Sequence, residues 1–229
     1  MTPFDITWSH SSLNMFLECP HKYYRVRIAK EFPFVETDAI REGNKIHRDI
    51  ELHLLARERG GNHSWNKGYD WLQEYASMAY DLPNLATEKE LALTAKLERC
   101  AWFSRTQTVW GRCKIDVLSL DGDTAHVLDW KTGKYWGPDQ QDIRTAMFLF
   151  WYYPELQVVN TNWVYMKPGK DEKKNTFTRA EHFMPTVGDT FRTLTAIAKA
   201  TNDNDWVKTP GKGCRFCDVL DCAYKGKNL

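Results

Sequence analysis

Two acidic residues and a lysine, closely spaced in the sequence, are the first residues of this chain that could carry out chemistry. Asp116 and Asp129 flank the turn sequence Asp121-Gly122-Asp123, and Lys131 follows Asp129 by two residues. A two-residue loop that begins at Gly122 is typical of a type II′ hairpin, and one that ends there is typical of type I′. In the first register the two acids face each other directly, and in the second they meet diagonally. Both registers place the acids and Lys131 on one face, whereas a three-residue loop would separate them.

Two carboxylates on one face of a hairpin repel each other, and the apolar residues beside them predict partial burial. Like charges at close range in such a place are costly unless a cation lies between them. Oxygen ligands favour Mg²⁺ or Mn²⁺, which would lower the pKa of a bound water and neutralise charge on a phosphate. Lys131 would then hold the water or the developing oxyanion. The alternative is a plain cross-strand ion pair between Asp116 and Lys131 on a solvated face.

These residues resemble the paired active-site motifs of RecB-type nucleases in the PD-(D/E)xK superfamily. The resemblance rests on the segments from Gly111 to Asp116 and from Val127 to Lys134. It implies that Asp116, Asp129 and the backbone carbonyl of Trp130 bind the metal.

The family also carries a G-x-x-x-H motif on an N-terminal helix, which Gly43 and His47 match, so the resemblance makes His47 a further metal ligand. A Q-x-x-x-Y motif usually follows the D-x-K segment, and here it is half present, with Gln141 but with Thr145 in place of the tyrosine. We expect Gln141 to orient water or phosphate, and its plain alternative is a solvated helix residue.

Four cysteines form a second candidate metal site. Cys214, Cys217 and Cys222 have metal-ligand spacing, and three thiolates need a fourth partner. The segment around Cys19 resembles the N-terminal cysteine of nucleases related to the AddB nuclease domain and to the CRISPR-adaptation nucleases. In those proteins one early and three late cysteines hold a [4Fe–4S] cluster, although their last gap is generally one residue longer. Zinc is the alternative, because four thiolates also satisfy Zn²⁺.

The remaining cysteines, Cys100 and Cys113, have no partner at ligand spacing, and we expect them to pack as small apolar residues. A disulfide framework is not expected, because the start of the chain shows no secretory signal and predicts a reducing cytoplasm in a bacterial, archaeal or phage-infected cell. No apolar run is long enough to span a bilayer.

The charge balance argues for a local basic path rather than a uniformly basic surface. The net charge is +1, while bases and aromatics alternate near the N-terminus. We therefore predict that Lys22, Tyr24 and Arg25 contact nucleic acid, with solvated charge and ordinary packing as the alternatives.

Periodicity predicts which elements position these residues. Helical spacing predicts helices at Ser9–Lys22, Asp38–Arg59, Trp65–Tyr80, Gln140–Tyr153 and Val187–Ala200. Alternation predicts strands at Glu90–Leu97, Val109–Leu120, Thr124–Lys131, Val158–Met166 and Phe177–Phe183, with a charged loop at Pro168–Asn175.

Helices followed by a small sheet and then alternating elements predict an α/β class, and the resemblance implies a restriction-endonuclease-like core with a small mixed sheet flanked by helices. We expect one nuclease domain over residues 1–229. Its helical region is 35–85, its catalytic sheet core is 86–185, and its cysteine region combines 1–34 with 205–229.

The leading functional hypothesis is a metal-dependent DNA exonuclease that hydrolyses phosphodiester bonds in recombination, end processing or degradation. A catalytically weak or inactive DNA-binding module and a structure-specific endonuclease on the same fold are the alternatives. The sequence contains no Walker-type phosphate loop, so any unwinding would come from a separate helicase or recombination protein.

Overall fold

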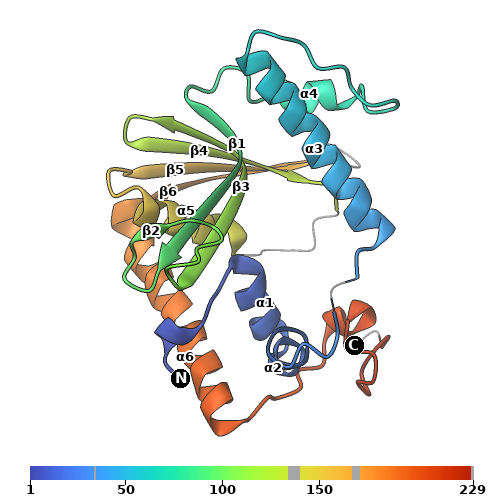
Figure 1. Ribbon diagram of the computed structural model, residues 1–229, viewed down its shortest axis with the longest axis vertical. Helices are drawn as coiled ribbons and strands as arrows, with labels where there is room; N and C mark the ends of the chain where they lie inside the picture. Colours follow the sequence, from blue (N-terminus) through green and yellow to red (C-terminus); the bar gives the residue numbers. More distant parts are fainter. Residues whose placement is uncertain (34, 134–139, 167–170, 228–229) are drawn as a thin grey trace. The chain divides into compact units, whose positions relative to one another are not determined.

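A six-stranded mixed sheet forms the main element of the computed structural model, which describes residues 1–33, 35–133, 140–166 and 171–227 (Figure 1). The strand order is β2-β1-β3-β4-β5-β6. The strands are β1 (Leu85–Thr94), β2 (Arg99–Cys100), β3 (Val109–Asp121), β4 (Thr124–Lys131), β5 (Val158–Tyr165) and β6 (Glu172–Thr178). β4 and β5 are parallel, while β3–β4 and β5–β6 are antiparallel. The predicted α/β class with a mixed sheet flanked by helices is confirmed.

The chain divides into two compact units. Unit 1 combines Met1–Val35, Ala92–Arg112 and Pro185–Leu229, and unit 2 combines Glu36–Leu91 and Cys113–Met184. The prediction of a single nuclease domain over residues 1–229 stays a prediction.

Helix α3 (Asp38–Glu58) positions one side of the candidate site in unit 2. It begins where the side chain of Thr37 accepts a hydrogen bond from the backbone N–H of Ile40, at 3.3 Å, as expected for a helix cap. The buried Ile46, Ile50 and Leu54 recur at helical spacing and point into the core. The predicted helix at this position is confirmed to within one residue.

Helix α4 (Leu72–Ser77) lies beside α3 (Figure 1), and the two share one apolar core with the sheet. The other buried members of that core are Leu72, Tyr75, Ala76, Ala79, Val117, Leu128, Trp130, Val164 and Met166. Burying each large side chain contributes roughly 1.5–3 kcal/mol, so this core fixes the helix against the strands that carry the acidic residues.

The predicted helix Trp65–Tyr80 is too long, because a buried carboxylate holds the segment before α4 in another conformation. Asp49 accepts hydrogen bonds from His63 Nε2 at 2.9 Å, from the backbone N–H of Asn66 at 3.2 Å and from its side-chain amide at 2.8 Å. Trp65 stacks on His53 of α3, with ring centroids 4.3 Å apart. These tertiary contacts override the local periodicity.

The β3–β4 hairpin has the two-residue loop that begins at Gly122. Asp121 pairs with Thr124 and Val117 pairs with Leu128. Gly122 has φ 58°, in the left-handed region that a type II′ turn requires at its first central residue. The predicted strand Thr124–Lys131 is confirmed at both ends.

Helix α5 (Gln141–Tyr152) connects the parallel strands β4 and β5, since a parallel pair needs a crossover. The predictions for the segment between β5 and α6 are largely wrong. Strand β6 (Glu172–Thr178) begins inside the predicted loop Pro168–Asn175 and includes only the first two residues of the predicted strand Phe177–Phe183. Residues 168–170 of that loop lie outside the described residues. Arg179–Phe183 forms a π-helix rather than a strand, because the Arg179 guanidinium donates to the carbonyls of Phe150, Tyr153 and Leu156 at 2.7–3.1 Å.

Unit 1 contains both ends of the described chain. The predicted helix Ser9–Lys22 is divided into α1 (His10–Glu18) and α2 (Pro20–Tyr23), with Cys19 in an extended conformation between them. Proline disfavours helical geometry in the residue before it and cannot donate a backbone hydrogen bond, which explains the break. Helix α6 (Met184–Asp203) confirms the predicted last helix and extends it at both ends. None of the described helices combines the length and apolar character needed to cross a membrane.

Candidate active site

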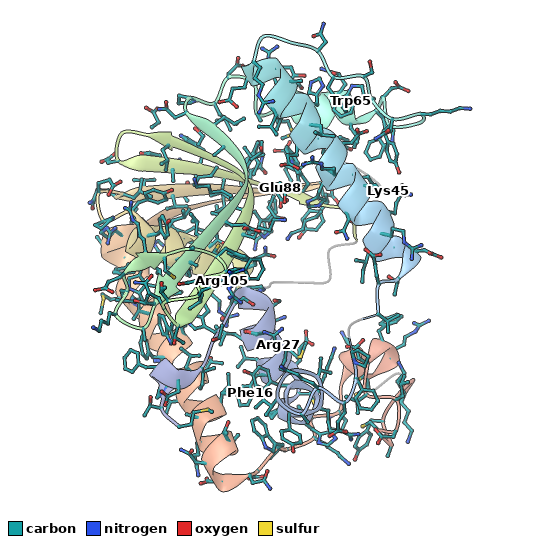
Figure 2. All side chains as sticks on the ribbon, viewed as in Figure 1. Phe16, Arg27, Lys45, Trp65, Glu88 and Arg105 are labelled. Atoms are coloured by element: carbon teal, nitrogen blue, oxygen red, sulfur yellow. The ribbon has the colours of Figure 1, made fainter. Side chains whose placement is uncertain are left out.

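A histidine and two carboxylates from three elements converge in unit 2. His47 of α3, Glu88 of β1 and Asp116 of β3 each offer a ligand atom, and these atoms all lie within 4.8 Å of one another. His47 Nδ1 is 3.4 Å from Asp116 Oδ2 and 4.0 Å from Glu88 Oε1. Figure 2 shows Glu88 where β1 passes beside α3. The structure thus brings together the predicted residues His47 and Asp116, and adds Glu88.

Glu88 is a site residue that sequence reasoning missed. Its backbone has φ 48° within β1, a left-handed conformation that is uncommon for any residue other than glycine. Such strain persists only where the surrounding structure fixes it, and it is frequent at functional sites. Glu88 also forms an ion pair with Lys114. In the sequence it belongs to the charged run Glu88-Lys89-Glu90, which has the pattern of a solvated strand end and gives no signal of convergence.

The predicted residues Asp129, Lys131 and Gln141 form a second group, closed by three contacts. Lys131 Nζ lies 2.5 Å from Asp129 Oδ2 and donates to Gln141 Oε1 at 2.8 Å. The Gln141 side-chain amide donates to Asp129 Oδ1 at 3.1 Å. The end of β4 and the first residue of α5 therefore fix the lysine ammonium in place. In the described part of the chain Lys131 pairs with Asp129 rather than with Asp116, contrary to the alternative of a plain Asp116–Lys131 pair.

A backbone hydrogen bond links the two groups. The N–H of Trp130 donates to Asp116 Oδ2 at 2.8 Å. The carboxylate of Asp116 therefore lies against β4, next to Asp129, as the hairpin register predicts. The proposed role of the Trp130 carbonyl as a metal ligand stays a prediction.

The electrostatics of the site favour a bound cation. Burial, followed by the charge of Asp116, raises the pKa of Asp129 to about 6, against the opposing effect of Lys131. Burial alone would lower the pKa of His47, but its hydrogen bond to Asp116 and the charges of Asp116, Asp129 and Glu88 raise it above the ordinary value. Crowded carboxylates with one imidazole nitrogen are a donor set that fits Mg²⁺ or Mn²⁺.

Gly43, the first residue of the predicted G-x-x-x-H motif, has a packing reason for being glycine. A Cβ at this position would lie 3.0 Å from Thr132 Oγ1, closer than ordinary van der Waals contact. The missing side chain therefore lets α3 approach the segment that follows Lys131.

Thr145 occupies the position where the family has tyrosine, and it serves packing in this chain. Its hydroxyl is hydrogen-bonded to the thiol of Cys113. Burial raises the pKa of Cys113 to about 12, so the thiol stays protonated and is not a nucleophile. This agrees with the expected packing role of Cys113.

The four predicted cluster ligands lie in unit 1 and are not gathered as a compact metal site. Cys19, Cys214, Cys217 and Cys222 all line one cavity of about 330 Å³. Among the described residues, however, no three of their sulfurs lie within 4.8 Å of one another. The described residues therefore contain no compact four-cysteine group, and the structure does not support an iron–sulfur cluster.

The predicted nucleic-acid contacts Lys22, Tyr24 and Arg25 have partners within unit 1. Lys22 Nζ lies 3.2 Å from Asp218, and Arg25 binds Asp221 at 2.9 Å as well as Glu31. Tyr24 stacks on Trp206 with centroids 5.1 Å apart. These contacts join the N-terminal segment to the C-terminal one and neutralise both cations, so the role in nucleic-acid binding stays a prediction without direct support.

Comparison with known proteins identifies the class to which this fold and site belong. The family model of the PD-(D/E)XK nuclease superfamily matches residues 7–222, and the chain belongs to that superfamily. Its members hydrolyse phosphodiester bonds with the help of divalent metals.

A solved structure shows a similar fold. A crystal structure from Eubacterium rectale, named “Putative exonuclease”, is 12% identical with a TM-score of 0.55, covering 97% of this chain and 89% of that chain. The crystal structure of SSO0001 is also 12% identical, with a TM-score of 0.47, covering 96% of this chain and 87% of that chain. A search of curated proteins found no significant match.

Proposed function

We propose that this nuclease is a Mg²⁺- or Mn²⁺-dependent deoxyribonuclease that digests DNA from its ends. The observation that carries the proposal is the convergence of His47, Glu88 and Asp116 beside the closed group of Asp129, Lys131 and Gln141. A site with this many carboxylates and the fixed ammonium of Lys131 is suited to holding a divalent cation and acting on a phosphate.

Each residue has a distinct role in the proposed mechanism. His47, Glu88, Asp116 and Asp129, with the carbonyl of Trp130, would hold the metal. When bound, the ion supplies a Lewis acid and lowers the pKa of a water molecule. Lys131 donates a hydrogen bond to the attacking water or to the oxyanion that develops on the phosphate.

Gln141 acts through Lys131 and Asp129 in this proposal. It donates to the carboxylate and accepts from the ammonium, so it fixes the direction of the lysine Nζ. Precise positioning of this kind is worth a large part of the rate in reactions that need little covalent chemistry from the protein.

End-directed action on DNA is the finer part of the proposal. It is supported by the resemblance to RecB-type nucleases and by the name of the Eubacterium rectale structure. The setting we propose is recombination, end processing or degradation. Since the sequence carries no Walker-type loop, a helicase or recombination protein would supply any unwinding. We place this activity inside the cell.

Incubation of the protein with linear and closed circular DNA in Mg²⁺ or Mn²⁺ tests the proposal. We expect the linear DNA alone to be degraded and EDTA to stop the reaction. Asp116→Asn should abolish cleavage, whereas Asp123→Asn, in the exposed hairpin turn, should not. Equal cleavage of the circle would replace the exonuclease by an endonuclease. DNA binding without any cleavage would favour an inactive binding module.

A four-cysteine metal centre in unit 1 is a second proposal, favoured by the single cavity that all four cysteines line. On one Zn²⁺ ion, with Zn–S bonds of about 2.3 Å, tetrahedral geometry would bring the sulfurs to about 4 Å from one another. A [4Fe–4S] cluster, in which iron and sulfide atoms lie between the thiolates, does not require this spacing.

Metal analysis of protein purified without air tests this second proposal. Iron with sulfide would support a [4Fe–4S] cluster, and one zinc per chain would support the alternative. Cys19→Ala should lose the metal and have a lower melting temperature. Cys100→Ala should keep the metal and the melting temperature of the wild type. Metal-free protein in which all four cysteines are readily alkylated while folded would overturn the proposal.

A further inference from the structure

A small cavity lies next to the candidate active site in unit 2. Its volume is about 220 Å³, and α3 contributes Ala39, Glu42, Gly43 and Ile46 to its wall. Counted from Ala39 these positions are i, i+3, i+4 and i+7, so they follow one stripe of the helix. His47 lies one turn beyond Gly43 on that stripe, and the cavity therefore begins within one helical turn of a proposed metal ligand.

The opposite wall begins next to the proposed catalytic lysine. Thr132 and Gly133, which follow Lys131 directly, line the same cavity. Because Gly43 has no side chain, Thr132 can approach α3 closely at this point. The cavity is thus bounded by the two segments that carry His47 and Lys131.

The described lining of the cavity suits a flat, neutral ring. Ile46 and Met166 are buried, and Trp71 adds an aromatic surface. Among the described residues that line the cavity none carries a positive charge, while Glu42 carries a negative one. A nucleobase can pack against these aromatic and apolar groups.

Glu42 supplies the polar contact that a base would need. Its Oε1 already accepts a hydrogen bond from the hydroxyl of Tyr69 at 2.8 Å, which orients the carboxylate. A carboxylate has further lone pairs, and it can accept from the exocyclic amino group of a base. Adenine, cytosine and guanine carry such a group and thymine does not.

We propose that this cavity receives the base of the nucleotide next to the scissile phosphate, with a preference for bases that carry an exocyclic amino group. The proposal rests on the nuclease function proposed above. It adds a subsite that reads the base while the metal site acts on the phosphate.

Abasic scanning of the substrate tests the subsite at single-nucleotide resolution. A set of linear oligonucleotides, each with one abasic position, is digested and the products are mapped. We expect cleavage of the bond beside the abasic nucleotide to fall at least about fivefold, since the stacking of one base is lost. Unchanged cleavage at every bond by an active enzyme would overturn the subsite and leave the nuclease function intact.

One variant tests the lining of the cavity, and a second variant on the same helix is its matched control. Ala39→Leu should fill the cavity, so the variant should cleave normal and abasic substrates equally and slowly. Ala39 is exposed, so the fold should tolerate the larger side chain. Ala56→Leu, on α3 but away from the cavity, should, like the wild type, cleave the normal substrate faster than the abasic one. If Ala39→Leu also cleaves the normal substrate faster than the abasic one, as the wild type does, the proposal is contradicted.

Glu42→Gln tests the base preference. Wild-type enzyme should cleave beside cytosine about threefold to tenfold faster than beside thymine, the worth of one hydrogen bond, and the variant should reduce this ratio. An unchanged ratio would exclude Glu42 as the reader of the base. Binding of internally labelled oligonucleotides in EDTA should show the same order of affinities. If the wild-type protein shows this binding preference but cleaves no substrate, the nuclease function is refuted and the base subsite is not.

Discussion

Replacing Asp129 by asparagine should change the pH dependence of stability in the metal-free protein. Burial and the neighbouring Asp116 raise the pKa of Asp129 from its ordinary 3.8 to about 6. The folded protein therefore holds this proton more tightly than the unfolded chain. The resulting contribution to stability is present below pH 4 and is lost as the pH rises through 6. At about 1.4 kcal/mol per pH unit, the difference between the two pKa values corresponds to about 3 kcal/mol.

The measurement compares the free energy of unfolding of Asp129→Asn and wild type by urea titration in EDTA at pH 4 and pH 7.5. Asparagine does not titrate, so the variant should gain about 2 kcal/mol relative to wild type between these pH values. Asp123→Asn, an exposed carboxylate in the same hairpin, controls for the substitution. Adding Mn²⁺ at pH 7.5 should stabilise wild type more than the variant.

Two results would refute this reasoning. If the difference between variant and wild type is the same at both pH values, Asp129 is not buried against a second charged carboxylate. If the variant loses stability relative to wild type as the pH rises, the ion pair with Lys131 dominates, and the folded-state pKa of Asp129 is lowered instead.

Three further predictions test the other residues of the site. Glu88→Gln should weaken Mn²⁺ binding measured by calorimetry at least about tenfold, whereas the exposed Glu90→Gln should not, and equal affinities would remove Glu88 from the metal site. Lys131→Met should keep Mn²⁺ affinity but lower the rate of cleavage about 10²-fold or more, and a parallel loss of affinity would make the lysine structural. Gly188→Ala, where a Cβ meets nothing closer than 3.6 Å, should raise stability by about 0.5–1 kcal/mol. Gly43→Ala should not raise stability and should slow cleavage, because its Cβ would lie 3.0 Å from Thr132. Full activity together with raised stability in this variant would show that the close approach has no role.

The hairpin and α3 could be predicted from sequence because local chemistry determines them. The glycine at position 122 fixes the turn, and the turn fixes which residues of β3 and β4 share a face. Helical spacing from Ile46 to Leu54 identifies α3 and its buried side. The hairpin register predicts that Asp116, Asp129 and Lys131 share one face, whereas the place of His47 near Asp116 was implied only by the resemblance to the RecB-type nucleases.

Other features depend on contacts that no local pattern reveals. Glu88 reaches the site through a left-handed backbone conformation. The sequence pattern misses the first part of strand β6 because, as the last strand of the sheet, it exposes Lys and Glu side chains, a common property of edge strands. The shortening of the helix near Trp65 depends on the buried Asp49, which lies far from it in the sequence.

The shared stripe on α3 has a consequence for how this chain can change by insertion and deletion. Successive helix residues are about 100° apart around the axis, so one residue inserted between Gly43 and His47 would turn the histidine away from Glu88 and Asp116. It would also shift Ala39 and Glu42 relative to the rest of their stripe. Length variation in homologous chains should therefore be absent from α3. It should concentrate instead at the exposed turn around Gly60 and Gly61, where neither the metal ligands nor the cavity would move.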